Sequence, residues 1–369
     1  MKILAIETSC DETAICIINF RKGSNNFTVE KNELISQIDI HREYGGVYPH
    51  MAKREHIKNL PILLEKVIGD EKKFKNIDVI AVTHGPGLSP ALWTGIEISK
   101  KISLEYNIPV YPINHMEGHI FASTLIQEKK RTTGNSNIKK ETTWSFGEVT
   151  YPAISLLISG GHTELIFIDK EMNYKKIGVT LDDAVGEAFD KVARTLGYPY
   201  PGGPEISKRA ELGRKLADTV REDLRLPRPM IHSHDLNFSF SGLKTSVINK
   251  VEKCKLEESE KELFCMEFEN AVTDVLVKKT REALYLYNAK TLIIGGGVSA
   301  NNHIRSVMGE MCANDGVKLY IPDRELSTDN ALMIAATAFM KVKNNIMPIK
   351  SKEKELEKIK AEPNLSLEK

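Results

Sequence analysis

Two histidines four residues apart, His115 and His119, follow an apolar run in the segment YPINHMEGHIFA, residues 111–122. On a helix, residues four apart share one face, so both imidazoles could bind one metal ion. The spacing alone leaves open that they are two surface histidines near the start of a helix. Met116 fills the position where the zinc-protease motif has its glutamate base, and Glu117 lies roughly 200° around a helix from His115. A metal site here therefore needs further ligands and a base from other segments.

Acidic residues are the second group that could do chemistry. Asp11 and Glu12 lie in the polar turn of ETSCDET, between two apolar segments that predict a strand–turn–strand hairpin. Acids in such a turn can organise a cation or accept a proton, but a lone aspartate there more often only forms the turn. Asp190 and Asp329 lie in the N-terminal halves of two predicted helices, where capping or compensation of the helix dipole is the alternative role.

Glycine-containing turns follow apolar strands in THGPGLSP, LISGGHTE and IIGGGVSANN, and YPYPGGPE is a fourth, less clearly placed turn. Glycine lets backbone N–H groups approach a phosphate closely, although tight turns need glycine as well. Four such turns in one chain favour a nucleotide-type ligand in a cleft. No segment matches the P-loop pattern GxxxxGK[ST], and GGGVSAN does not fit the dinucleotide-binding motif in its proper context.

Length and composition limit the classes of protein that remain. A chain of 369 residues predicts two domains, and its net charge of +1 means that any surface for nucleic acid is a local patch. Five cysteines without a CxxC pair indicate a reducing compartment rather than a disulfide framework. The first apolar run stops at Glu7, unlike a signal peptide, and no apolar stretch is long enough to span a bilayer. These features predict a cytoplasmic protein.

The hydrophobic periodicity predicts an α/β protein, because strand patterns alternate with helical patterns along most of the chain. We expect a first domain over residues 1–128, a polar linker or insertion over 129–150, and a second domain over 151–342. A helical insertion is predicted at about 182–286 within the second domain, and the helix from about 327 is a candidate to pack back on the first. The charged tail, 343–369, is expected to fray.

Eleven short blocks, in order, resemble one family over roughly residues 1–340. They are similar to blocks of the tRNA N6-adenosine threonylcarbamoyltransferase family. Relatives of this family were formerly called O-sialoglycoprotein endopeptidases. The block ETSCDET favours the bacterial-type branch of the family. The resemblance implies two actin-like, RNase H-like domains of the ASKHA superfamily around a central cleft, with a helical insertion in the second. The blocks are ETSCDET, YGGVYP with AKREH, THGPGLSPAL, NHMEGH, SGGHTEL, DDAVGEAFDKVARTLG, YPGGP, PRPM, FSFSGLKT, GGGVSANN and STDNALMIA.

The resemblance also implies a set of site residues. One divalent metal ion per subunit would be held by His115, His119 and Asp329, with Fe²⁺ as the first choice and Zn²⁺ or Mg²⁺ as alternatives. Asp11 and Glu12 match the family's acidic turn and are the candidate catalytic residues. An adenylate ligand in the cleft would be bound by residues that match the family's substrate-binding positions: Leu157, Ile158, Ser159, Gly160, Gly161, Asp190, Gly203 and Asn301.

The implied reaction transfers the threonylcarbamoyl group of threonylcarbamoyl-AMP to N6 of adenosine 37 in tRNAs that read ANN codons, and it releases AMP. The implied partners are the tRNA anticodon loop, an inert paralogue subunit (TsaB-like) and a small ATPase (TsaE-like), without a membrane. A metalloprotease and a small-molecule kinase of the same superfamily are the alternatives. His50 departs from the family, which usually has glutamate there. Candidate contacts with the tRNA backbone are Lys53, Arg54, Arg221, Arg225 and Arg228.

Overall fold

The computed structural model describes residues 1–128, 142–217, 222–253 and 257–368. Within these residues the chain divides into two compact units. The first unit consists of Met1–Ile40, Val47–Glu148 and Thr328–Leu367, and the second consists mainly of His41–Gly46 and Val149–Ser327. No helix in the described part of the chain is long and apolar enough to cross a membrane.

The first unit is built on a seven-stranded sheet with the order β5-β4-β1-β2-β3-β7-β6. The strand β1 pairs antiparallel with β2 and parallel with β4, which in turn pairs parallel with β5. Because the carboxyl ends of parallel strands meet at one edge of a sheet, the segments after β1, β4 and β5 lie close together. The strands are β1 (Lys2–Glu7), β2 (Glu12–Asn19), β3 (Asn26–Ser36), β4 (Val79–Gly85), β5 (Val110–Asn114), β6 (Leu125–Gln127) and β7 (Thr142–Phe146).

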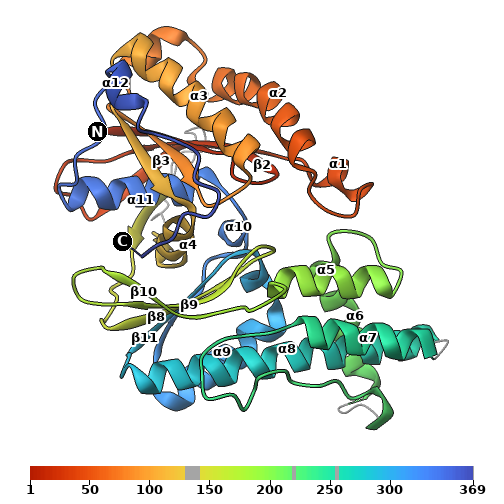
Figure 1. Cartoon of the computed structure of the whole chain (residues 1–369). Helices are drawn as coiled ribbons and strands as arrows, with labels where there is room; N and C mark the ends of the chain where they lie inside the picture. Colours follow the sequence, from red (N-terminus) through yellow and green to blue (C-terminus); the bar gives the residue numbers. More distant parts are fainter. Residues whose placement is uncertain (129–141, 218–221, 254–256, 369) are drawn as a thin grey trace, which may run out of the picture. The chain divides into compact units, whose positions relative to one another are not determined.

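Helices cover both faces of this sheet, as Figure 1 shows. On one face, α2 and α3 pack over a core that includes Leu4 and Ile6 of β1. On the other face lie α4 and α11, which also pack against each other. Successive side chains of a strand point to opposite faces, so Glu7 faces away from the core of Leu4 and Ile6. The helices are α1 (Ile38–Arg42, whose last two residues belong to the second unit), α2 (Pro49–Ile68), η1 (Glu71–Asn76), α3 (Ser89–Tyr106), α4 (His115–Ser123), α11 (Ala331–Lys343) and α12 (Glu353–Leu356).

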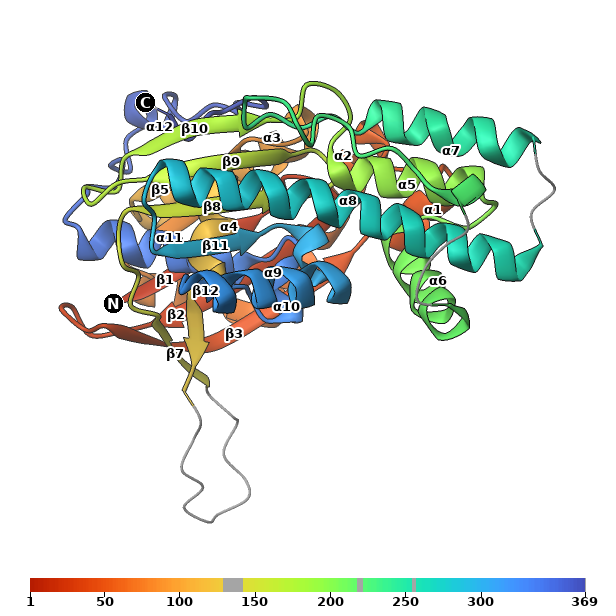
Figure 2. The ribbon, with the colours of Figure 1, turned by 90° about the horizontal axis from the view of Figure 1, so that it is seen from below.

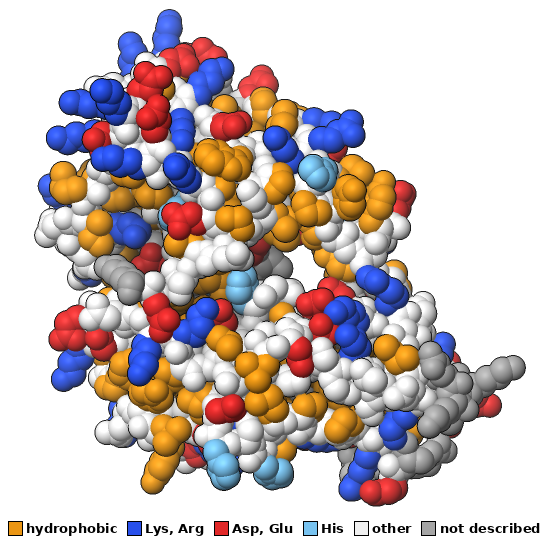
Figure 3. Space-filling view, in the orientation of Figure 1, with side chains coloured by type: hydrophobic (Ala, Val, Ile, Leu, Met, Phe, Trp, Pro, Cys, Tyr) orange, Lys and Arg blue, Asp and Glu red, His pale blue; other side chains and the backbone are white. Residues whose placement is uncertain are grey.

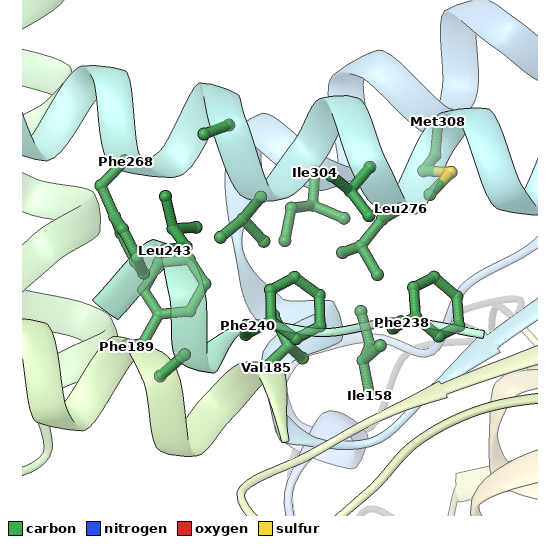
Figure 4. Close-up of a cluster of buried hydrophobic side chains, with 14 of the residues drawn as sticks. Ile158, Val185, Phe189, Phe238, Phe240, Leu243, Phe268, Leu276, Ile304 and Met308 are labelled. Carbon is green, nitrogen blue, oxygen red and sulfur yellow. The ribbon is translucent and has the colours of Figure 1, made fainter. Parts of the chain in front are cut away.

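The second unit has a five-stranded sheet with the order β10-β9-β8-β11-β12, in which β8 and β11 are parallel. Figure 2 shows α8 and α9 covering one face of it. Beyond the sheet, α5, α6 and α7 pack with α8 around aromatic side chains such as Phe189, Phe240 and Phe268 (Figure 4). The elements are β8 (Ala153–Ile158), β9 (Thr163–Ile168), β10 (Tyr174–Val179), α5 (Val185–Thr195), α6 (Gly202–Leu216), η2 (Glu222–Leu224), α7 (Ser241–Lys253), α8 (Glu258–Leu286), β11 (Thr291–Gly295), η3 (Gly297–Ala300), α9 (Asn302–Asp315), β12 (Lys318–Tyr320) and α10 (Arg324–Ser327).

The predicted α/β class is confirmed, and the described part of the region predicted as a helical insertion contains α5, α6, η2, α7 and α8. Two expectations are wrong. Part of the predicted linker, Thr142–Phe146, is the strand β7, which pairs with β3 and β6 and buries Trp144. Residues 129–141 of that linker lie outside the described residues.

The second wrong expectation concerns the tail, which packs on the first unit instead of fraying. Ile349 exchanges backbone hydrogen bonds with Val110 of β5, and Leu356 and Ile359 are buried in the core of the first unit. The composition of the tail suggested solvent exposure, because exposed lysine and glutamate residues lie between these buried apolar positions in the sequence. The tail therefore belongs to the fold.

Helical glycines give a test of the close packing between α6 and α8. A Cβ on Gly213 would clash with the carbonyl oxygen of Glu262, whereas one on Gly309 of α9 would meet nothing within 4 Å. We expect Gly213→Ala to destabilise the second unit by about 1–3 kcal/mol through overpacking. Gly309→Ala should stabilise it by about 0.8–1 kcal/mol, because alanine favours the helix. Urea unfolding followed by circular dichroism checks both, and equal effects of the two substitutions would contradict the packing.

Candidate functional site

The histidine pair lies where β5 meets α4. Asn114 ends β5, and its side-chain oxygen accepts hydrogen bonds from the N–H groups of Met116 and Glu117, which caps α4. His115 is therefore the first residue of α4, and His119 lies one turn further along. Both are buried, and their ring centroids are 4.8 Å apart. The four-residue spacing has brought the two imidazoles together, as predicted.

Asp329 completes a group of three ligand atoms. It precedes Asn330, which caps α11, and the packing of α11 against α4 brings it to the histidines. Its Oδ1 lies 3.3 Å from Nε2 of His115 and 3.2 Å from Nε2 of His119. The potential ligand atoms all lie within 4.8 Å of one another. Two imidazoles and one carboxylate suit Fe²⁺ or Zn²⁺ and leave coordination positions open, so the residues fit the implied metal.

The electrostatics of the triad favour charged forms in spite of burial. Burial opposes a charge on His115, but the nearby carboxylates of Asp329 and Glu7 outweigh it and raise the pKa of His115 well above its usual range. Burial likewise opposes ionisation of Asp329, yet His115 and His119 hold the pKa of that carboxyl well below its usual range. A cation bound here would replace the proton on His115, because histidine binds a metal ion only through an unprotonated nitrogen.

Glu7 and Ser9 contact the triad and were not among the residues predicted from the sequence. Glu7 Oε2 lies 3.3 Å and Ser9 Oγ 3.1 Å from Nδ1 of His115. For Glu7, the sequence shows a carboxylate at the end of the strand KILAIE, whose four middle residues are apolar. Charged residues are almost never fully buried unless they are paired, so the need for a partner of Glu7 becomes evident once the structure shows that it is buried.

The acidic turn between β1 and β2 lies in the same unit. Asp11 is buried, and its backbone carbonyl accepts a hydrogen bond from Gln37 N–H at 3.0 Å. Burial, followed by the charges of Asp11 and Asp329, raises the pKa of Glu12 well above its usual range. The hydroxyl of Ser36 lies 3.5 Å from Glu12 Oε1. Glu12 is therefore a carboxyl whose environment favours the protonated form more than water does.

The predicted substrate-binding stretch, Leu157 to Gly161, spans the end of β8 and the turn after it. Leu157 pairs with Gly295 of β11, so two glycine-containing turns lie at the same edge of the second sheet. Ser159 Oγ accepts the N–H groups of Gly161 at 3.3 Å and His162 at 3.1 Å, which stabilises the first turn. The roles of these residues toward a ligand stay predictions.

The other predicted substrate-binding residues gather around α6. Asp190 accepts the N–H of Gly202 at 2.7 Å, and burial raises its pKa. Asn301 caps α9 through its oxygen and donates from its amide to Glu269 and Ser207, both at 2.6 Å. Ser207 lies one turn after Gly203 on α6. A cavity of about 350 Å³ lies beside Asp190 and is also lined by Arg42, Glu43, Tyr44, Gly45, Arg194, Tyr198, Pro199 and Tyr200.

The candidate tRNA contacts differ in their surroundings. Arg228 binds the carboxylates of Glu267 and Asp274, and Arg225 lies 3.4 Å from Glu222. These two arginines are thus paired within the protein, whereas Lys53 and Arg54 are exposed on α2. Arg221 lies outside the described residues. On the face shown in Figure 3, basic and acidic side chains are interspersed, as a net charge of +1 leads one to expect.

Comparisons with solved structures support the fold alone. HypF in its phosphate- and nucleotide-bound form is 13% identical, with a TM-score of 0.54, over 94% of this chain and 56% of that one. Component A of (R)-2-hydroxyglutaryl-CoA dehydratase from Acidaminococcus fermentans is 14% identical, with a TM-score of 0.50, over 93% of this chain and 99% of that one. The chain therefore shares its fold with these two proteins.

Comparisons of sequence are more specific. Proteins called tRNA N6-adenosine threonylcarbamoyltransferase are 42% identical in Fusobacterium nucleatum, over 93% of this chain and 92% of the relative, and 43% identical in Persephonella marina, over 94% and 91%. The relative of that name in Bacillus subtilis is 41% identical over 91% of this chain and 89% of its own length. The profile of the family described as TsaD, tRNA N6-adenosine threonylcarbamoyltransferase, matches residues 28–133 and 138–336. The ordered motifs, the two units and these matches show that the chain belongs to the tRNA N6-adenosine threonylcarbamoyltransferase family.

Proposed function

We propose that the chain forms N6-threonylcarbamoyladenosine at position 37 of tRNAs that read ANN codons, with threonylcarbamoyl-AMP as the acyl donor. The observation that carries this proposal is the match to the family over more than nine-tenths of the chain. The reaction class follows from the family: the chain is an acyltransferase that modifies adenosine in tRNA.

The two alternative functions are less well supported. A metalloprotease of the HExxH type needs its glutamate directly after the first histidine, and Met116 stands there. Glu117 faces Lys341 of α11 at 3.5 Å rather than the ligand atoms of the triad. A small-molecule kinase shares the fold, but the fold alone does not assign a reaction, and the three-ligand site has no required part in such a kinase.

The metal site would hold one divalent ion, with Fe²⁺ as the first choice and Zn²⁺ next. Imidazole ligands suit both ions, whereas Mg²⁺ prefers oxygen ligands, so the two histidines disfavour the Mg²⁺ alternative. When bound, such an ion would orient the donor and stabilise negative charge on its oxygens. His115, His119 and Asp329 would hold it at the carboxyl edge of the first sheet.

The acidic turn would handle the proton. N6 of adenosine attacks the carbamoyl carbon, the new C–N bond forms, the C–O bond to AMP breaks, and N6 loses one proton. We assign Glu12, assisted by Asp11, to accept that proton. The support is its raised pKa, since a base works best when its pKa lies near the working pH.

The adenylate would be bound in the second unit by the turn Ser159–Gly161 and by Asp190, Gly203 and Asn301. The support is their position around the carboxyl ends of β8 and β11, where ligands of open α/β sheets commonly bind. We further propose a cytoplasmic enzyme that binds the tRNA anticodon loop and works with an inert paralogue subunit and a small ATPase. Lys53 and Arg54 are the candidate phosphate contacts, because both are exposed.

Reconstitution tests the function directly. The purified chain, loaded with Fe²⁺ and supplied with the two partner proteins, threonylcarbamoyl-AMP and unmodified tRNA, should yield modified adenosine 37. Mass spectrometry of nuclease digests reads the product, and a tRNA with guanosine at position 37 is the control. A folded, metal-loaded chain that leaves adenosine 37 unmodified with all partners present would refute the proposal.

A further inference from the structure

We propose that Glu7 is a positioning residue for the metal site: its buried carboxylate holds a hydrogen on Nδ1 of His115 and thereby directs the lone pair of Nε2 toward Asp329. The inference rests on the proposed metal site but concerns a residue outside the three candidate ligands. Glu7 is the last residue of β1, and its side chain has no exposed surface. Its place on the face of β1 opposite Leu4 and Ile6 puts it on the side of α4.

Among the described residues, two groups donate hydrogen bonds to the carboxylate of Glu7, and His115 makes a further contact with it. Oε1 accepts the N–H of Ser9 at 2.5 Å, and Oε2 accepts the hydroxyl of Thr83 at 2.6 Å. The third contact joins Oε2 to Nδ1 of His115 at 3.3 Å. An ionised carboxylate has only acceptors, so this contact is favourable only when Nδ1 carries the hydrogen. Nε2 then remains as the metal-binding nitrogen, and it is the atom that faces Asp329.

Ser9 is consistent with the same arrangement. Its hydroxyl oxygen lies 3.1 Å from Nδ1 of His115 and 3.5 Å from Oδ2 of Asp329. A hydroxyl can accept from Nδ1–H and donate its own hydrogen to a carboxylate. With the hydrogen on Nδ1, the serine thus makes a favourable contact on each side.

A second buried histidine of the same unit shows the opposite arrangement. Nε2 of His56 lies 3.0 Å from the backbone carbonyl oxygen of Cys10, which can only accept, so the hydrogen is on Nε2. Nδ1 of His56 lies 2.8 Å from the hydroxyl of Thr13, which donates to it. His115, which belongs to the triad, has a carboxylate beside Nδ1, whereas His56 has a hydroxyl there.

This arrangement should matter for metal affinity. A carboxylate behind a metal-binding histidine fixes the ring and makes the opposite nitrogen more basic, and loss of such a partner typically costs about 10–100-fold in affinity. Glutamine has nearly the same shape as glutamate but only one acceptor oxygen. It can satisfy the N–H of Ser9 or the Nδ1–H of His115, but not both.

The test compares two variants of the full chain, with Zn²⁺ as the probe and a chromophoric chelator as the competitor. We expect Glu7→Gln to weaken Zn²⁺ binding about 10–100-fold. Thr13→Val is the matched control, because it removes a buried contact to the imidazole of His56, which lies outside the triad. The Zn²⁺ affinity of this variant should equal that of the unaltered chain. Circular dichroism establishes that both variants are folded.

The outcomes separate the inference from the proposals on which it rests. Unchanged Zn²⁺ affinity in folded Glu7→Gln would overturn the role of Glu7 and leave the metal site standing. An unaltered chain that binds no Zn²⁺ would overturn both, while the transferase assay would still test the reaction. If Glu7→Gln does not fold, NMR of the unaltered, Zn²⁺-loaded chain with ¹⁵N-labelled histidine decides. A hydrogen on Nδ1 of His115 supports the inference, and Zn²⁺ on Nδ1 overturns it.

Discussion

Replacing Asp329 with asparagine should weaken the binding of Fe²⁺ or Zn²⁺ by at least about 100-fold. Loss of a residue that only supports a metal ligand costs up to about 100-fold in affinity, and loss of a ligand itself should cost no less. The carboxylate oxygen Oδ1 lies 3.3 and 3.2 Å from the two histidine nitrogens, so it is placed to share an ion with both. Asparagine keeps the shape of the side chain but removes the charge. We expect formation of N6-threonylcarbamoyladenosine to fall by a similar factor.

Two measurements check this expectation. Competition with a chelator gives the metal affinity, and mass spectrometry of the tRNA gives the rate of modification. Glu117→Gln is the matched control, because Glu117 lies on α4 between the two histidines but faces Lys341 instead of the triad. It should bind metal and modify tRNA as the unaltered chain does.

The pair of variants also separates the functional alternatives. If Asp329→Asn kept full metal affinity and full activity, the three-residue site would be wrong. If Glu117→Gln abolished activity while metal stayed bound, a base on α4 would be required, as in a metalloprotease. The salt bridge between Glu117 and Lys341 favours the expected result. In that result Asp329→Asn loses metal affinity and activity, and Glu117→Gln keeps both.

The candidate metal site shows what the sequence could and could not predict. The spacing of His115 and His119 predicted one shared helix face, because the geometry of a helix is local. Asp329 came only from the resemblance to the family, since no local pattern links it to residues two hundred positions earlier. In the structure the link is the packing of α11 against α4, which is a tertiary contact.

Glu7 and the tail were not predicted for related reasons. Hydrophobic periodicity ended the first strand at Glu7 and gave no reason to place that carboxylate inside the protein. In the tail, the composition suggested solvent exposure, yet Leu356 and Ile359 pack into the core of the first unit. In both cases burial is decided by segments distant in the sequence, here α4 for Glu7 and the first sheet for the tail.

Replacing Glu12 with glutamine should lower the rate of the transfer step by about 100- to 10,000-fold, the usual contribution of a positioned general base. The unaltered enzyme should lose activity as the pH falls through the pKa of Glu12, because the protonated carboxyl cannot accept a proton. That pKa is raised by burial and by the charge of Asp11, so the acid limb should lie above the ordinary glutamate value of about 4.3. Single-turnover rates against pH, with metal and tRNA in excess, measure the limb.

Asp11→Asn distinguishes the two acids of the turn. It removes a negative charge beside Glu12, so the pKa of Glu12 should fall and the acid limb should move to lower pH while the transfer step persists. Glu12→Gln should instead remove the limb together with most of the rate. If Asp11→Asn removed the limb and Glu12→Gln only shifted it, the proton would go to Asp11. If neither substitution changed the limb or the rate, the turn would serve the fold alone, because a base must leave its own pKa in the profile.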